Sequence, residues 1–298
     1  MPGPETRARV RTDQTTDRPD GLSVCIITLN EQDRLPRCLD SVSFADELIV
    51  VDSGSKDETA AVARERGARV VKRAFEGFVI QKNFAISLAR FEWVLVIDAD
   101  EVVTPELARA IQEVTGRDDV QANGPVAYRV ARMSYYLGRW IRHSGWYPDY
   151  NIRLFRRGFA SFEGGTVHET VVPMGPVATL PGHLEHYSYG DISDHLARID
   201  AYSTLLAQDK HRRGKRSSIP WAITKSCSKF FLTYVYRLGF LDGYAGLVIA
   251  VLGAYYNFLK YVKLWELNHG LRRFRPIVDP AKLARDAAEV EIRMLERS

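Results

Sequence analysis

The sequence predicts an α/β fold in which a mostly parallel sheet is flanked by helices. Apolar, β-rich runs without charges alternate with segments of helical periodicity through the first hundred residues. The alternation has the spacing of right-handed crossover units, which place successive strands in parallel. The chain has 298 residues, 46% hydrophobic and 26% charged. This composition is that of a globular protein of about two domains and excludes a disordered or fibrous one.

The expected elements follow one another in the order of such a sheet. Strands are expected at 22–29, 47–51, 69–72 and 93–97, and helices at 34–44, 57–66 and 78–89. Polar clusters follow three of the strands, at 28–31, 52–57 and 98–101. In a doubly wound sheet the ligand binds outside the carboxyl ends of the strands. The three clusters are therefore predicted to meet in one crevice.

The most informative cluster is Asp98-Ala99-Asp100-Glu101, which directly follows an apolar strand. Alternate residues there can aim two carboxylates at one point, and Mg²⁺ or Mn²⁺ joins such carboxylates to a substrate diphosphate. The structural alternative is a polar turn that caps the next helix. Asp52 ends the second strand and can accept hydrogen bonds from a nucleobase or ribose, while Thr28 and Glu31 end its neighbour. This combination favours the metal and nucleotide interpretation.

Several enzyme classes lack their signatures in this chain. A dinucleotide-dependent dehydrogenase needs Gly-x-Gly-x-x-Gly after the first strand, where this chain has Thr28-Leu29-Asn30-Glu31. A sugar-nucleotide pyrophosphorylase would carry a glycine-rich, basic loop at the same place. No Walker loop occurs, which disfavours kinases and ATPases. No nucleic-acid recognition motif accompanies the basic residues, so a nucleic-acid partner is not expected.

Four pieces carry a family resemblance: Thr28-Leu29-Asn30-Glu31, Val51-Asp52-Ser53-Gly54-Ser55-Lys56-Asp57, Gln81-Lys82-Asn83 and Asp98-Ala99-Asp100-Glu101. Together, over residues 22–110, they resemble the donor-binding half of a family 2 glycosyltransferase with the GT-A fold. The resemblance implies a nucleotide-diphosphate sugar donor, a divalent metal (Mg²⁺ or Mn²⁺) and inversion at the anomeric carbon. It implies that Asp98 and Asp100 serve the ribose, diphosphate and metal. The donor-binding residues would be Thr28, Asn30, Glu31, Asp52, Gly54, Lys82 and Asp98, although Asn30 fits a turn equally well.

An inverting transfer needs a general base for the acceptor hydroxyl, which we expect in the acceptor half, residues 116–196. Glu169 is the first candidate, because it follows a short apolar run and a glycine pair and would lie at the sheet edge facing the acceptor. Asp149 is the second; its structural alternative is an ion pair with Arg153 or Arg156.

Three further residues are acceptor-side candidates. His168 is either a structural histidine or a further metal ligand. His186 either shapes the acceptor site or packs. Arg153 alternates with apolar residues as on an edge strand, where it would either meet a phosphate or protect the sheet edge from aggregation.

The carboxyl-terminal region differs in charge from the rest. Residues 1–196 carry 28 acidic and 23 basic side chains, whereas residues 197–298 carry 9 and 18. Residues 243–259 form a run of 17 without a charge, the lower edge of what spans a bilayer, and aromatic residues surround it. We expect this region to lie on an anionic membrane surface. The alternatives are a spanning helix, or a solvated basic helix followed by a buried one.

The expected organisation is a disordered tail at 1–20, a GT-A domain at 21–196 with its donor half at 21–115, and a membrane-associated helical extension at 197–298. Three cysteines without paired spacing indicate a reducing compartment.

A closer resemblance adds Tyr147-Pro148-Asp149 to Arg156, Val167-His168-Glu169 and the basic, aromatic extension. With these, the chain looks like the lipopolysaccharide-core β-glucosyltransferase branch. That branch implies glucose transfer from UDP-glucose to a lipid-anchored inner-core saccharide at the cytoplasmic face of the inner membrane, by a peripheral or monotopic enzyme. The alternatives are a polyprenyl-phosphate or other glycolipid acceptor, and a non-catalytic membrane-associated scaffold.

Overall fold

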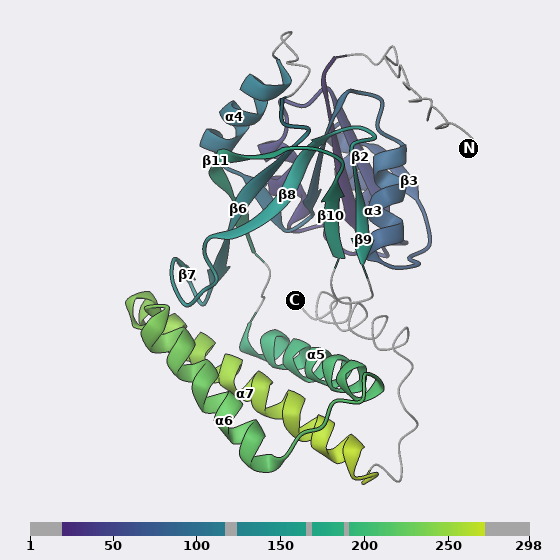
Figure 1. The fold of residues 1–298 in the computed structure, drawn as a ribbon. Helices are drawn as coiled ribbons and strands as arrows, with labels where there is room; N and C mark the ends of the chain where they lie inside the picture. Colours follow the sequence, from purple (N-terminus) through teal and green to yellow (C-terminus); the bar gives the residue numbers. More distant parts are fainter. Residues whose placement is uncertain (1–19, 117–123, 165–168, 188–190, 272–298) are drawn as a thin grey trace, which may run out of the picture.

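The structure is a computed structural model that describes residues 20–116, 124–164, 169–187 and 191–271. Figure 1 shows a sheet with flanking helices and, on one side of it, a unit of three long helices. Most of the predicted tail, residues 1–19, lies outside the described residues. The division into domains stays a prediction.

The amino-terminal half of the sheet is parallel, with strand order β3-β2-β1-β4. Its strands are β1 (Leu22–Thr28), β2 (Glu47–Asp52), β3 (Arg69–Lys72) and β4 (Trp93–Asp98), and its helices are α1 (Leu35–Ser41), α2 (Thr59–Glu65) and α3 (Phe78–Ser87). The predicted elements are confirmed to within a few residues at their ends. Val, Ile and Leu fill β1, β2 and β4 almost without interruption, as strands covered by helices on both faces require.

The register brings the predicted polar clusters to one edge. Thr28 pairs with Asp52 on one side of β1, and Ile27 pairs with Asp98 on the other. Three strands that are far apart in sequence therefore end side by side. The convergence of the polar clusters that the sequence predicts has its structural basis in this register.

The other half of the sheet is mixed and continues the order as β4-β8-β6-β11-β5. Its elements are β5 (Glu101–Val103), α4 (Pro105–Thr115), β6 (Ala127–Tyr136), β7 (Arg139–Trp140), β8 (Asp149–Arg156) and β11 (Val177–His186). The expected edge position of the strand that carries Arg153 is wrong, because β8 pairs with β4 on one side and β6 on the other. The charge of Arg153 is tolerated between two strands because the carboxylates of Asp98 and Glu101 neutralise it.

A small hairpin stands apart from this sheet. β9 (Ala160–Gly164) and β10 (Glu169–Pro173) pair with each other in a separate two-stranded sheet. Phe162 and Val171 of the hairpin pack with Ala85 and Ile86 of α3 in one apolar cluster. Glu169 therefore projects from a hairpin fixed to α3, and not from the edge of the main sheet as expected.

The three-helix unit consists of α5 (Ile192–Arg212), α6 (Ile219–Phe231) and α7 (Gly243–Asn268). A π-helical turn, Leu232–Tyr236, and a 3-10 turn, Gly239–Asp242, join α6 to α7. Within the described residues, one stretch, Gly239–Asn268, is long and apolar enough to cross a membrane, judged by length and composition alone. Asp242 fixes the unit to the loop before β8, because its carboxylate accepts hydrogen bonds from the backbone of His143 (3.0 Å) and the hydroxyl of Ser144 (2.8 Å).

Candidate active site

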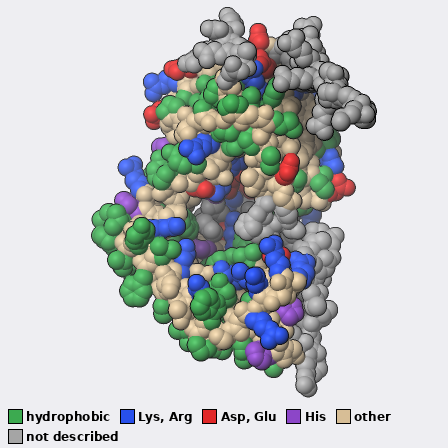
Figure 2. Space-filling model, viewed as in Figure 1, with side chains coloured by type: hydrophobic (Ala, Val, Ile, Leu, Met, Phe, Trp, Pro, Cys, Tyr) green, Lys and Arg blue, Asp and Glu red, His purple; other side chains and the backbone are tan. Residues whose placement is uncertain are grey.

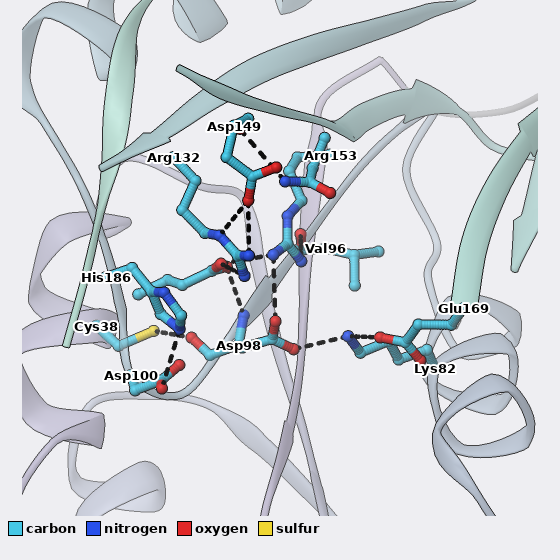
Figure 3. A network of polar contacts seen from close by, with 12 residues as sticks. Cys38, Lys82, Val96, Asp98, Asp100, Arg132, Asp149, Arg153, Glu169 and His186 are labelled. Carbon is cyan, nitrogen blue, oxygen red and sulfur yellow. Dashed lines mark hydrogen bonds and ion pairs between the residues drawn. The ribbon is translucent and has the colours of Figure 1, made fainter. Parts of the chain in front are cut away.

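A network of charged side chains occupies the carboxyl end of β4 (Figure 3). We call it the strand-end network; its members are Lys82, Asp98, Asp100, Glu101, Arg132, Asp149, Arg153, Glu169 and His186. Asp98 is at its centre. One Asp98 oxygen lies 2.8 Å from Lys82 Nζ, and the other lies 3.2 Å from Arg153 Nη2. Arg153 Nη2 also lies 2.5 Å from Glu101 Oε1.

Lys82 connects α3 to the hairpin. Its side chain is only 3% exposed, and its ammonium lies between Asp98 and Glu169, 2.5 Å from Glu169 Oε1. Burial lowers the pKa of Lys82, but Asp98 and Glu169 outweigh that effect and leave the pKa above its ordinary value. Burial likewise raises the pKa of Asp98, while Lys82 and Arg153 reverse this and hold it far below its usual range. The pair is therefore ionised throughout the neutral pH range.

Asp100 forms a second pair, with His186 at the end of β11. Asp100 Oδ2 lies 3.3 Å from His186 Nε2, because the antiparallel β5–β11 pairing sets His186 opposite Glu101. Burial raises the pKa of Asp100, but His186 outweighs burial, and the net pKa is lowered. His186 Nδ1 is buried without a hydrogen-bond partner among the described residues. The structure thus brings His186, predicted on the acceptor side, next to a predicted metal ligand.

Asp149 lies at the open side of the network. Its partner is Arg132 of β6, at 2.7 Å, and not the Arg153 or Arg156 that the sequence suggested. The Asp149 side chain is 43% exposed, and Arg132 also approaches Glu101, at 3.6 Å. Asp149 is therefore linked to the network but faces solvent.

The predicted donor-side residues build the turns at the ends of β1 and β2. Asp52 accepts hydrogen bonds from the backbone of Gly54 (3.2 Å) and Ser55 (3.1 Å) and from the Ser55 hydroxyl. Gly54 has φ of 101°, a conformation that favours glycine. The Asn30 side chain accepts from the backbone of Lys56 (2.8 Å), which ties the two turns together. These contacts give Asp52 and Asn30 a structural role beside the one predicted.

Thr28 and Glu31 are the next predicted donor-side residues. The Thr28 hydroxyl is buried and has no hydrogen-bond partner among the described residues, so it is free to meet a ligand. The backbone N–H of Glu31 donates to Thr59 Oγ1 at 2.7 Å, which fixes the start of α2 against the end of β1. His168 lies outside the described residues.

Sequence reasoning missed the parts played by Glu101 and Arg132. Glu101 is fully buried, and besides its pair with Arg153 it accepts a hydrogen bond from the Asp98 backbone at 3.0 Å. Its position directly after the Asp-x-Asp pair was the available signal. Arg132 carries no local signal, because only the pairing of β6 with β8 brings it to Asp149.

The charges of the network fit a divalent cation that arrives with a diphosphate. The network contains five carboxylates and three permanent cations, so apart from His186 its formal charge is −2. A diphosphate alone would be repelled by this site. Both Asp98 oxygens already face cations, whereas Asp100 pairs with His186 through Oδ2 alone, and His186 Nδ1 has no hydrogen-bond partner in the described part of the chain. The parts of the chain that the structure describes hold no group of three or more acidic, His or Cys side chains placed to bind a metal alone.

Comparison with known proteins identifies the family. The sequence model of "Glycosyl transferase family 2" matches residues 23–172. A *Rickettsia typhi* protein named an uncharacterized glycosyltransferase is 33% identical over 259 residues, which cover 83% of this chain and 87% of the relative. This chain belongs to glycosyl transferase family 2. The predicted family, and the predicted α/β class with the GT-A fold, are confirmed.

Another relative of this family 2 glycosyltransferase has a more specific name. It is the lipopolysaccharide core biosynthesis glycosyltransferase LpsC of *Rhizobium meliloti*, 32% identical over 268 residues, which cover 87% of this chain and 97% of LpsC. Among solved structures, *S. aureus* TarS 1–349 in complex with UDP-GlcNAc is 14% identical with a TM-score of 0.43, over 87% of this chain and 95% of TarS 1–349. Glucosyl-3-phosphoglycerate synthase from *Mycobacterium tuberculosis*, in complex with Mn²⁺, UDP-glucose and glycerol 3-phosphate, is 27% identical with a TM-score of 0.32, over 41% and 46% of the two chains.

Proposed function

We propose that this family 2 glycosyltransferase moves a sugar, with glucose as the first candidate, from a UDP-sugar to the lipid-anchored saccharide of the lipopolysaccharide core, with inversion. The observation that supports this most is the strand-end network, in which Asp98, Asp100 and Glu169 come together from distant segments beside a buried lysine. The LpsC relative supports the acceptor class. The network itself needs no acceptor to explain it, so it supports the donor more directly than the acceptor.

The donor would bind across the ends of β1, β2 and β4. In this arrangement the unpartnered Thr28 hydroxyl and the turn held by Asp52 receive the nucleoside, and Lys82 stands close to the diphosphate. Asp100 and His186 would hold a Mg²⁺ or Mn²⁺ ion, whose charge would offset that of the departing diphosphate. Asp98 would act mainly by fixing Lys82 and Arg153, because both of its oxygens face these cations.

Glu169 remains our candidate for the general base. One of its oxygens contacts Lys82, and the other, Oε2, is buried without a hydrogen-bond partner among the described residues. A carboxylate oxygen in that state can accept the proton of an acceptor hydroxyl. If Lys82 turns toward the diphosphate when the donor binds, Glu169 loses its paired cation and becomes a stronger base. Asp149, which keeps Arg132 and faces solvent, is the second candidate.

The three-helix unit offers a surface for a membrane. Figure 2 shows hydrophobic side chains together with Lys and Arg on this unit. The junction of α6 and α7 exposes large apolar side chains, with Tyr236 81% exposed; the others include Phe231, Val235, Phe240, Leu241 and Tyr244. The basic residues of the unit lie at the end of α5 and in the turn after it, at the other end of α6 from that junction; they are Lys210, Arg212, Arg213, Lys215 and Arg216. We propose that the unit docks on the anionic cytoplasmic face of the inner membrane, where a lipid-anchored acceptor lies, and that the apolar junction and the basic turn contact the membrane at two separate places.

The test is a product analysis. The purified protein is incubated with Mn²⁺ and UDP-glucose, UDP-galactose or UDP-N-acetylglucosamine, and with lipopolysaccharide core, polyprenyl phosphate or a membrane lipid extract; products are identified by mass spectrometry. We expect one hexose added to the core from UDP-glucose. Transfer to polyprenyl phosphate alone would replace the acceptor class. Neither transfer nor UDP binding would indicate a non-catalytic scaffold and overturn the proposal.

A further inference from the structure

A cavity of about 390 Å³ lies within the three-helix unit, away from the strand-end network. Helices α5, α6 and α7 and the turn after α6 contribute most of its lining. Three cationic side chains line it, Arg198, Lys229 and Lys260, together with apolar ones that include Ile249 and Leu252. The volume is that of a site for a small ligand, and the mixed lining suits a ligand with a charged and an apolar part.

In the described part of the chain, the positive charge of this cavity is compensated at only one of its three cations. Arg198 pairs with Asp194 at 3.0 Å. Among the described residues, no carboxylate lies within ion-pair distance of Lys229 or Lys260; Lys260 Nζ instead donates to Asn257 Oδ1 at 2.6 Å and lies 5.2 Å from the Tyr256 ring centre. Burial, with Lys210 and Lys229 nearby, lowers the pKa of Lys260 to about 8. An anion in the cavity would remove this repulsion.

A buried hydroxyl also points to a ligand. Thr233, in the π-helical turn, lines the cavity and is 1% exposed. Its Oγ1 has no hydrogen-bond partner among the described residues. A buried polar group without a hydrogen-bond partner is costly and uncommon. A ligand with a hydrogen-bond acceptor could give the Thr233 hydroxyl the partner that the protein does not provide.

We propose that this cavity binds the phosphate group of a membrane lipid. Lys229, Lys260 and Thr233 would contact the phosphate oxygens, and Ile249 and Leu252 would contact the apolar part. A lipid is favoured over a free phosphate because half of the site is apolar, and because the cavity lies beside the exposed apolar junction of α6 and α7. The inference goes beyond sugar transfer, and it rests on the proposed membrane docking only for where the lipid comes from.

The first experiment measures binding by isothermal titration calorimetry in solution. The probes are dihexanoylphosphatidic acid below its micelle concentration and inorganic phosphate, each added to the full-length protein. We expect the lipid phosphate to bind and inorganic phosphate to bind at least about tenfold more weakly, because it lacks the apolar contacts. No sugar or acceptor is present, so a negative result here leaves the product analysis above unaffected.

Matched variants locate the site. Lys229→Gln should weaken lipid binding by about tenfold, the value of one hydrogen bond to a charged group. Lys225→Gln removes the same charge from the same helix, but Lys225 lies over the Trp221 ring at 4.5 Å and outside the cavity lining, so binding should stay unchanged. Thr233→Val keeps the side-chain shape. It should weaken binding without lowering the thermal midpoint, because the lost hydroxyl has no partner in the free protein.

Four results would overturn the proposal. Equal affinity for inorganic phosphate would make the ligand a free anion. Equal losses for Lys225→Gln and Lys229→Gln would reduce the effect to general surface charge. The absence of lipid binding, or unchanged binding in both Lys229→Gln and Thr233→Val, would leave the cavity without this ligand.

Discussion

Replacing Glu169 by Gln tests the assignment of the general base. The change preserves size but removes the negative charge that lies 2.5 Å from Lys82. Lys82 keeps Asp98 at 2.8 Å, and the Glu169 side chain is 27% exposed, so the loss of stability should be small, about 1 kcal/mol. Loss of a general base lowers turnover by about 10²- to 10⁴-fold. At about 1.4 kcal/mol per tenfold, this corresponds to about 3–6 kcal/mol of lost transition-state stabilisation.

The assay compares kcat with the dissociation constant of the UDP-sugar. We expect kcat to fall by at least about 100-fold while donor binding changes less than about threefold, since the base acts on the acceptor hydroxyl. Asp149→Asn is the matched control, because Asp149 is the other carboxylate candidate and is bound to Arg132. If Glu169→Gln keeps its turnover and Asp149→Asn loses it, the base is Asp149 and our reasoning from the unpartnered Glu169 oxygen is wrong.

Three further predictions concern other parts of the molecule. Asp98→Ala leaves Lys82 and Arg153 with one carboxylate each, so we expect sugar transfer to be lost and the free energy of unfolding in urea to fall by about 2 kcal/mol. The fall is smaller than for a fully buried pair because Asp98 is partly exposed. An unchanged free energy of unfolding would show that the network is not tightly coupled. Changing the five basic residues to Ser should release the protein from anionic vesicles, since each contributes about 1 kcal/mol, and high salt should mimic the change; persistent binding would point to a spanning α7. The variant replaces Lys210, Arg212, Arg213, Lys215 and Arg216. Burial, with Arg198 nearby, lowers the pKa of His195 to about 4, so the unfolded chain takes up the proton first as the pH falls. The free energy of unfolding should therefore drop by about 2 kcal/mol more between pH 7 and pH 5 in the wild type than in His195→Gln, and equal drops would contradict the assignment.

The parallel half of the sheet was predictable because its signals are local. Strands β1, β2 and β4 are built on apolar runs, the short β3 has two valines between charged residues, and each helix between the strands has its own periodicity. The crossover rule then fixes how they pair. Because Asp52 and Asp98 directly follow such strands, their convergence could be predicted as well.

The mixed half was harder to predict because its pairings join distant segments. The alternation around Arg153 has the pattern of an edge strand, yet β8 lies between β4 and β6, and the charge is accommodated by Asp98 and Glu101. The contact between Asp100 and His186 depends on the β5–β11 pairing, across more than eighty residues of sequence. No local sequence pattern predicts either strand pairing, so the positions of Arg153 and His186 in the site could be found only from the structure.

The most direct test of the account is a calorimetric titration of the protein with UDP in the presence and absence of Mn²⁺. We expect Mn²⁺ to tighten UDP binding by at least about tenfold, because the strand-end network is negative without a cation. Asp100→Ala should abolish that difference while the protein stays folded with a cooperative thermal transition, although loss of the pair with His186 should lower the thermal midpoint. Equal UDP affinity with and without Mn²⁺, or a Mn²⁺ effect that survives in Asp100→Ala, would contradict the claim that these carboxylates and a metal together hold the diphosphate.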